Sequence, residues 1–269
     1  METAGANSKE PFREKELQSA AESIARAAGA HIMAEQLVGR KVLAELSSDV
    51  KLEADLILER FILAELSSRT GLPILSEECG WEAGRECGSG PHWIVDPLDG
   101  TVNFSRAIPL SCISIALWDG TRPVLGVIYD FYRDECFSGL TGHGAWLNGE
   151  PMRVSEVADK HRAMICTGFP PVTDFNSPAL TKFVDRLRAY RKVRSLGSAA
   201  LSIAYVACGR MDLYIENDLR IWDIAAGIPM VLAAGGQVRY EPTSIPFGYR
   251  IAAANQALGL LEDLEPWNG

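Results

Sequence analysis

Two stretches near the start of the chain repeat apolar residues at the spacing of an amphipathic helix. In the first stretch the apolar positions are Leu17, Ala21, Ile24 and Ala28. They recur at intervals of four, three and four residues, which places them on one helical face. In the second stretch the face expected to be buried consists of Leu58, Phe61, Ile62 and Leu66. The pattern therefore predicts two helices, and we interpret the first as scaffold.

Alternating apolar positions then predict a series of neighbouring strands. In residues 111–118 serine and apolar residues alternate, so Ile113, Ile115 and Leu117 share one face and we expect a half-buried strand. Further strands are expected at 124–129 and 135–140. Asp119–Gly120 is expected to form the turn after the first of these strands, and we expect all three to be neighbouring antiparallel strands. Asn148–Gly149 is a strong signal for another hairpin further along the chain.

The second half of the chain is expected to alternate strands with helices. The strands are expected at 163–167, 193–195, 211–216, 237–239 and 251–254, and the helices at 178–190, 198–209 and 222–234. Ser198 is a suitable N-cap for the second of these helices. Pro229 lies inside the last one, where it should kink the axis at a cost of about 3 kcal/mol. We place the boundary between two halves, 1–150 and 151–269, near residues 150–157.

Composition narrows the class of protein. Of the 269 residues 47% are hydrophobic and 23% are charged, and the formal net charge is −9. Such values are typical of a soluble globular protein, and the acidic balance argues against a nucleic-acid partner. Six cysteines without a C-x-x-C pair, no signal-like apolar core and no long apolar run lead us to expect a cytoplasmic protein without a membrane span.

The stretch W-I-V-D-P-L-D-G-T-V-N-F, residues 93–104, concentrates the candidate chemistry. A short apolar run delivers Asp96 and Asp99 into a turn that contains Pro97. Gly100 leaves the backbone accessible, and Thr101 is a good opener for a turn of helix, whose first N–H groups bind phosphate. Carboxylates for a hard cation beside an anion-binding turn indicate a metal-assisted phosphate site. Taken alone, the same residues would also suit an ordinary turn.

Three motifs in order resemble the inositol monophosphatase family. They are I-L-S-E-E at 74–78, D-P-L-D-G-T at 96–101 and I-W-D-I-A-A-G at 221–227. The similarity extends from about Asp49 to Asn255. The resemblance implies a layered αβαβα sandwich, an α+β fold of the inositol monophosphatase and fructose-bisphosphatase type. It further implies one compact catalytic unit, with most metal ligands in residues 1–150 and Asp223 and the substrate contacts in 151–269.

The resemblance also implies a set of metal ligands. They are Glu77, Asp96, the carbonyl of Leu98, Asp99 and Asp223. All-oxygen ligands favour Mg²⁺, or Mn²⁺, over zinc. Two such ions would balance the four carboxylates, and a third, weaker ion is expected near Asp55. The family usually has Thr three residues before that acid, where this chain has Leu52, so Asp55 could equally be an exposed acid at a helix start.

The catalytic groups and the substrate follow from the same resemblance. Thr101 and Glu77 are expected to orient or deprotonate a water, with Asp55 as an outer catalytic acid. The expected substrate contacts are Asp99, Gly100, Thr101, Gly197, Ser198, Ala199, Glu216 and Asp223. A carboxylate at Glu216 suits the hydroxyls of a polyol, so inositol 1-phosphate is the leading substrate. Histidinol phosphate, fructose 1,6-bisphosphate and 3′-phosphoadenosine 5′-phosphate are the alternatives.

The resemblance implies two further properties, lithium sensitivity and a homodimer. A different class of function is also open, a regulatory binding protein that retains the fold. The complete set of acids argues against it, since a protein without catalysis has little physical reason to keep four mutually repelling carboxylates.

Overall fold

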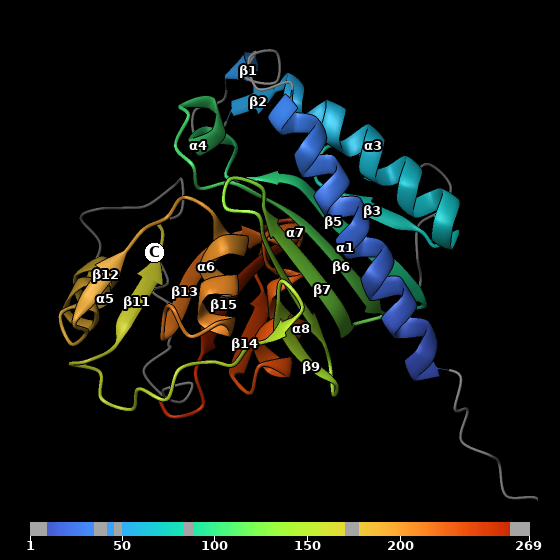
Figure 1. The fold of residues 1–269 in the computed structure, drawn as a ribbon. Helices are drawn as coiled ribbons and strands as arrows, with labels where there is room; N and C mark the ends of the chain where they lie inside the picture. Colours follow the sequence, from blue (N-terminus) through green and yellow to red (C-terminus); the bar gives the residue numbers. More distant parts are fainter. Residues whose placement is uncertain (1–9, 35–41, 46–49, 83–88, 170–177, 259–269) are drawn as a thin grey trace, which may run out of the picture.

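Sheets and helices alternate in layers in the computed structural model, which describes residues 10–34, 42–45, 50–82, 89–169 and 178–258. In the order given, the layers are helices α1 (Glu10–Ala34) and α3 (Glu53–Thr70), an eight-stranded sheet, helices α6 (Ala199–Ala207), α7 (Ile221–Ile224) and α8 (Gly227–Ala233), a five-stranded sheet, and helix α5 (Pro178–Leu187) (Figure 1). This arrangement confirms the layered αβαβα sandwich.

The eight-stranded sheet is antiparallel except for one pair. Its strands, in spatial order, are β10 (Glu150–Pro151), β9 (Gly144–Leu147), β8 (Glu135–Leu140), β7 (Arg122–Asp130), β6 (Cys112–Asp119), β5 (Pro91–Asp99), β3 (Ile74–Ser76) and β4 (Gly80–Trp81). Strands β3 and β5 run parallel, so their carboxyl ends meet at one edge. The predicted hairpin at Asn148–Gly149 is confirmed between β9 and β10. A separate two-stranded ribbon is formed by β1 (Val42–Glu45) and β2 (Val50–Leu52).

The five-stranded sheet is mixed. Its strands are β12 (Lys192–Arg194), β11 (Met164–Thr167), β13 (Leu213–Arg220), β15 (Gly248–Ala254) and β14 (Gln237–Pro242). The first three run parallel, and β15 and β14 are antiparallel to their neighbours. Ligands bind outside the carboxyl ends of parallel strands in such sheets, so residues after β11 and β12 and near the end of β13 are well placed for a site.

The outer helices bury the faces that the sequence predicts. In α1, Ala21, Ile24 and Ala28 are fully buried, and in α3 the same holds for Leu58, Ile62 and Leu66. These side chains share one core with the facing side of β5, β6 and β7. Phe61 is only partly buried at the edge of this core. Gly71 ends α3 in the left-handed conformation, with φ 66°.

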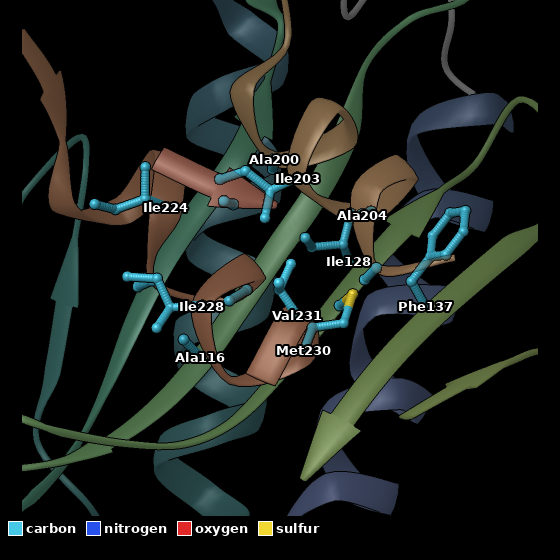
Figure 2. Close-up of a cluster of buried hydrophobic side chains, with 14 of the residues drawn as sticks. Ala116, Ile128, Phe137, Ala200, Ile203, Ala204, Ile224, Ile228, Met230 and Val231 are labelled. Atoms are coloured by element: carbon cyan, nitrogen blue, oxygen red, sulfur yellow. The ribbon is translucent and has the colours of Figure 1, made fainter. Parts of the chain in front are cut away.

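The middle helices pack on the opposite face of the large sheet. Figure 2 shows side chains of α6, α7 and α8, among them Ile203, Ile224 and Met230, against Ala116, Ile128 and Phe137 of the sheet. Two sheet glycines permit the close approach. A Cβ on Gly126 would lie 1.9 Å from the carbonyl oxygen of Ala226, and a Cβ on Gly139 would lie 2.4 Å from the Cα of Met230.

The burial of β6 differs from the prediction. A half-buried strand was expected at residues 111–118, but β6 is buried on both faces up to Trp118. As the alternation predicts, Ile113, Ile115 and Leu117 share one buried face. The opposite face carries Ala116 and Trp118, which belong to the core beneath α6 and α8. A central strand between two helical layers has no solvent face, and small residues on one side imitate the pattern of an exposed one.

The prediction of a single helix at 222–234 is wrong. The segment forms two short helices, α7 and α8, and Pro229 is the third residue of α8. The first N–H groups of a helix have no partner within it, so proline at this position removes no hydrogen bond. The predicted kink is replaced by a break between the helices.

None of the helices that the structure describes is long and apolar enough to cross a bilayer. The large sheet ends at Pro151 and the small sheet begins at Met164. We propose that residues 1–150 and 151–269 form two halves of one catalytic unit, since the core around α6–α8 draws on both sheets.

Gly126→Ala should destabilise the protein by about 3 kcal/mol, because the new methyl group would overlap backbone that cannot move without shifting α7 and α8. Gly142→Ala is the control. Gly142 has φ +79° and no atom within 4 Å of its would-be Cβ, so only backbone strain of about 1 kcal/mol is expected. Urea unfolding of both variants measures the difference, and equal losses would contradict the close-approach argument.

Candidate functional site

A cavity of about 680 Å³ lies where the end of β5 faces the parallel strands of the small sheet. Its lining includes most residues predicted for the site. They are Glu77, Asp96, Leu98, Asp99, Gly100, Thr101, Gly197, Ser198, Ala199, Glu216 and Asp223. The fold thus brings together residues that lie up to 146 positions apart in the sequence, from Glu77 to Asp223.

The end of β5 shapes the first wall of this cavity. The pairing of β5 with β6 is irregular between Asp96 and Asp99, which leaves room for the turn. The Leu98 N–H donates to Asp96 Oδ1 at 3.0 Å, and Thr101 Oγ1 donates to the Leu98 carbonyl at 2.9 Å. Gly100 has φ 86°, and a Cβ there would lie 2.7 Å from the Leu110 carbonyl oxygen. Glycine is therefore required at this turn. The helix predicted after it is α4 (Thr101–Ser105).

The start of α6 shapes the second wall. Ser198 is the N-cap, and its Oγ accepts from the Leu201 N–H at 3.2 Å, as the sequence predicts. Asp99 Oδ2 accepts from the Ala200 N–H at 2.8 Å and also from Ser198 Oγ. The positive end of α6 therefore stabilises a carboxylate from β5.

Asn103 makes a second link between the two walls. Its Nδ2 donates to the carbonyl of Leu110 at 2.8 Å and to the carbonyl of Leu196 at 2.8 Å, with the Gly197 carbonyl at 3.2 Å. This buried amide joins α4 to the loop that leads into α6. The turn at Gly100–Thr101 and the turn at Gly197–Ser198 are therefore held at a fixed separation.

Asp223 comes from α7, the short helix after β13. Its Oδ2 accepts from the Arg220 N–H at 2.7 Å, so the carboxylate is fixed at the first turn of this helix. Glu77 follows β3 directly, and its own N–H donates to the Val95 carbonyl at 3.2 Å. The parallel pairing of β3 with β5 thus places Glu77 beside Asp96.

The carboxylates of the site repel one another. Burial raises the pKa of Asp96 well above its usual value, and the charges of Glu77, Asp99 and Asp223 raise it further. The pKa of Asp223 is also raised well above its usual value, by burial and then by Glu77 and Asp99. For Asp99, burial raises the pKa and the bonds from Ser198 and Ala200 oppose it. Apart from contacts among the carboxylates themselves, these three aspartates accept hydrogen bonds from backbone N–H groups, a hydroxyl and a thiol.

The donor chemistry of this cluster fits a hard divalent cation. In the part of the chain that the structure describes, no three Asp, Glu, His or Cys side chains form a ready-made coordination group. Asp96 shares a hydrogen bond with Glu77 instead, which raises its pKa. Sharing a proton is how repelling carboxylates coexist without a cation between them. All the candidate donors are oxygen atoms, as Mg²⁺ and Mn²⁺ prefer.

Glu216 lies at another part of the cavity, on β13. Burial raises the pKa of its carboxyl to about 7, while bonds from Tyr214 and Gly168 oppose the rise and the charge of Asp99 adds to it. The Tyr214 hydroxyl donates to Glu216 Oε2 at 2.8 Å. The residue predicted to contact the leaving group is thus a half-buried acceptor.

In the part of the chain that the structure describes, Asp55 does not line this cavity. Its Oδ2 accepts from the Leu52 N–H at 2.6 Å, and its side chain is buried at the first turn of α3. The carboxylate therefore acts as a helix cap. It lies at a helix start, as the alternative interpretation of the sequence has it, but it is buried and not exposed.

Sequence reasoning missed three residues of the site. Asn103, Gly168 and Tyr214 hold other site residues in place without belonging to the predicted set. The period of two along a strand, which puts Tyr214 and Glu216 on one face, was a usable signal for Tyr214. Asn103 and Gly168 act across contacts that no local pattern reveals.

Comparisons with known proteins point to one family. The sequence model described as "Inositol monophosphatase family" matches residues 13–258. A protein of Xylella fastidiosa named "Nus factor SuhB" is 40% identical over 192 residues, covering 71% of this chain and 68% of that protein. "Inositol-1-monophosphatase" of Synechocystis is 39% identical over 218 residues, covering 78% and 74%. The solved structure of Mycobacterium tuberculosis SuhB is 31% identical, with a TM-score of 0.80, covering 95% of this chain and 98% of that one.

Asp96→Asn should stabilise the metal-free protein at alkaline pH. Asparagine keeps an oxygen that accepts from the Leu98 N–H but removes one repelling charge. A carboxyl whose pKa is raised by folding loses stability as pH rises from the usual carboxyl range through the raised pKa. In chelator, the variant should match the wild type near about pH 5 and exceed its free energy of unfolding near about pH 8 by about 1–3 kcal/mol.

Urea unfolding at the two pH values measures this difference. Glu241→Gln is the control, because Glu241 is a half-exposed acid outside the cavity whose pKa is lowered by Arg250 and Arg239, so its loss should bring no gain. An Asp96→Asn variant less stable than the wild type near pH 8 would show that repulsion does not dominate at this position.

Proposed function

The chain belongs to the inositol monophosphatase family and is a phosphoric monoester hydrolase, and we propose that it hydrolyses inositol 1-phosphate to inositol and phosphate in the presence of Mg²⁺. One observation carries the proposal. A single cavity is lined by the carboxylate cluster, the turn at Gly100–Thr101 and, at another part of its wall, the half-buried carboxylate of Glu216. Such a cavity suits a phosphate group at one part and a hydroxylated leaving group at the other.

The family is metal-dependent, and we propose Mg²⁺, with Mn²⁺ as a substitute. The atoms that would hold two ions are the carboxylates of Glu77, Asp96, Asp99 and Asp223 and the carbonyl of Leu98. When bound, such ions neutralise the carboxylates, polarise the phosphate and lower the pKa of a water. We do not extend the proposal to a third ion or a catalytic role at Asp55, whose carboxylate caps α3.

The chain's own groups would position the phosphate and the attacking water. Because Thr101 Oγ1 donates its proton to the Leu98 carbonyl, its lone pairs are turned to accept a hydrogen bond from the water. The Glu77 carboxylate is the base that accepts a proton from that water. Backbone N–H groups at the start of α4 would hold the phosphate oxygens. The water oxygen bonds to phosphorus as the bond to the leaving oxygen breaks, and that oxygen takes up a proton to become a hydroxyl.

The leaving group would lie against Glu216 and the turn at Gly197–Ala199. A carboxylate accepts hydrogen bonds from the hydroxyls of a polyol, and this favours inositol 1-phosphate over a bisphosphate, whose second charge it would repel. Histidinol phosphate, fructose 1,6-bisphosphate and 3′-phosphoadenosine 5′-phosphate are the alternatives that a substrate panel separates. Lithium sensitivity and a homodimer accompany the proposal as properties implied by the family.

A second role, in regulation, is suggested by the relative named "Nus factor SuhB". A regulatory role would not need the carboxylate cluster, so it is separable from catalysis. A variant without turnover that still performed such a role would reveal it.

Asp223→Asn should lower phosphatase activity by at least about 100-fold while the protein stays folded, because it removes one charge from the cluster that holds the metal. Excess chelator should abolish the activity of the wild type, and added Mg²⁺ should restore it. The control is Asp119→Asn in the exposed turn between β6 and β7, where no change is expected. Near-normal turnover of Asp223→Asn at saturating Mg²⁺, or full activity in chelator, would rule out the metal-assisted mechanism.

Glu216→Gln should separate the candidate substrates, because the neutral amide is a poorer acceptor. The activation barrier for hydrolysis of inositol 1-phosphate should rise by roughly 1.5–3 kcal/mol, the strength of a charge-assisted hydrogen bond. The loss should be larger for histidinol phosphate, whose amine loses a partner charge. The hydrolysis of fructose 1,6-bisphosphate should become faster, because a repelling charge is removed.

An aryl phosphate is the reference for this panel, since it has no hydroxyl for Glu216 to bind. Rates for the four substrates with wild type and variant, at fixed Mg²⁺, rank the alternatives. Unchanged rates for all four substrates would show that Glu216 does not contact the leaving group, and the proposed preference for inositol 1-phosphate would lose its basis.

A further inference from the structure

The carboxylate of Glu216 is held from two directions. On its own strand, the Tyr214 hydroxyl donates to Oε2 at 2.8 Å. From the residue directly after the neighbouring strand β11, the Gly168 N–H hydrogen-bonds to the carboxylate and lowers its pKa. A surface glutamate has several rotamers, whereas this half-buried one lies between two fixed donors. Its orientation is thus determined by its neighbours.

Gly168 allows this arrangement because it has no side chain. A Cβ at this position would lie 2.3 Å from Glu216 Oε1 and 2.5 Å from both Cδ and Oε2. The backbone has little freedom to retreat, because Thr167 pairs with Ile215 and Thr167 Oγ1 donates to the Ile215 carbonyl at 2.6 Å. Any larger residue here would push the carboxylate away.

Tyr214 is equally constrained. Its side chain is 1% exposed, and it shares a face of β13 with Glu216 because the two are separated by one residue. Burial raises the pKa of the Tyr214 phenol well above its usual value, and the charge of Glu216 adds to the rise. The hydroxyl therefore keeps its proton and donates to Glu216.

We propose that Tyr214 and Gly168 are positioning residues that fix Glu216 as a preorganised acceptor, and that the preference proposed for this carboxylate, for leaving groups that donate from hydroxyls, depends on them. The inference rests on the proposed function, since it refines which leaving groups the same cavity takes. A fixed acceptor binds a matching hydroxyl without first losing side-chain freedom. It also discriminates against a leaving group without that hydroxyl, because its own desolvation is then uncompensated.

The test compares kcat/KM for inositol 1-phosphate with kcat/KM for p-nitrophenyl phosphate, whose leaving group lacks aliphatic hydroxyls. Tyr214→Phe should lower the ratio of the two about tenfold, the factor expected for one hydrogen bond to a charged group. Gly168→Ala, at the position directly after β11, should also lower the ratio. Tyr240→Phe on β14 is the matched control, since Tyr240 packs against Trp118 away from the cavity, and its ratio should equal that of the wild type.

The double variant Tyr214→Phe/Glu216→Gln distinguishes positioning from a general effect on the fold. If Tyr214 acts through Glu216, the double variant should have the same ratio as Glu216→Gln alone. Equal losses on both substrates in Tyr214→Phe, or additive losses in the double variant, would overturn the inference. Hydrolysis of p-nitrophenyl phosphate by each variant also reports that it is folded.

The wild-type measurements test the proposed function separately. A wild type without preference for inositol 1-phosphate over p-nitrophenyl phosphate would contradict the proposed substrate. If such a wild type instead preferred another hydroxylated substrate, the same variants measured with that substrate would decide the inference by the same criteria.

Discussion

The mutual repulsion of carboxylates that line one cavity is the constraint on which the rest of the site depends. Asp96, Asp99 and Asp223 all have raised pKa values, and burial is the largest cause for each. The fold tolerates them because a backbone N–H holds one oxygen of each carboxylate, from Leu98, Ala200 and Arg220 respectively. Each anchor fixes a carboxylate without neutralising it. The protein therefore keeps a cluster of carboxyl groups in place whose shared protons a cation can replace, which is the property that a cation site requires.

The middle helices connect this cavity to both sheets. Helix α6 supplies the N–H that holds Asp99, and α7 carries Asp223, while α6, α7 and α8 share a core with strands of both sheets. Gly126 allows the chain between α7 and α8 to lie directly on β7. The packing of the interior and the position of the charges are thus set by the same short helices.

Much of the fold and of the site could be predicted from the sequence, and the failures have physical causes. The faces of α1 and α3, the hairpin at Asn148–Gly149 and the cap at Ser198 follow from local patterns, and the structure has all of them. The exposure of β6 and the break before Pro229 depend on what packs against those segments, which periodicity does not contain. The carboxylates were found through three motifs. Asn103, Gly168 and Tyr214 were missed because they support the site through contacts with other residues.

The links between the two walls of the cavity also bear on how the chain folds. Asp99 bonds to Ala200 across 101 positions, and Asn103 bonds to Leu196 across 93. Contacts of such long sequence separation form slowly, because a large loop must close before they contribute. Asp223 joins the other acids only when α7 has docked on the large sheet. In a chain where α7 has not docked, Asp223 therefore lies apart from Asp96 and Asp99, and its repulsion with them arises only when that contact is made.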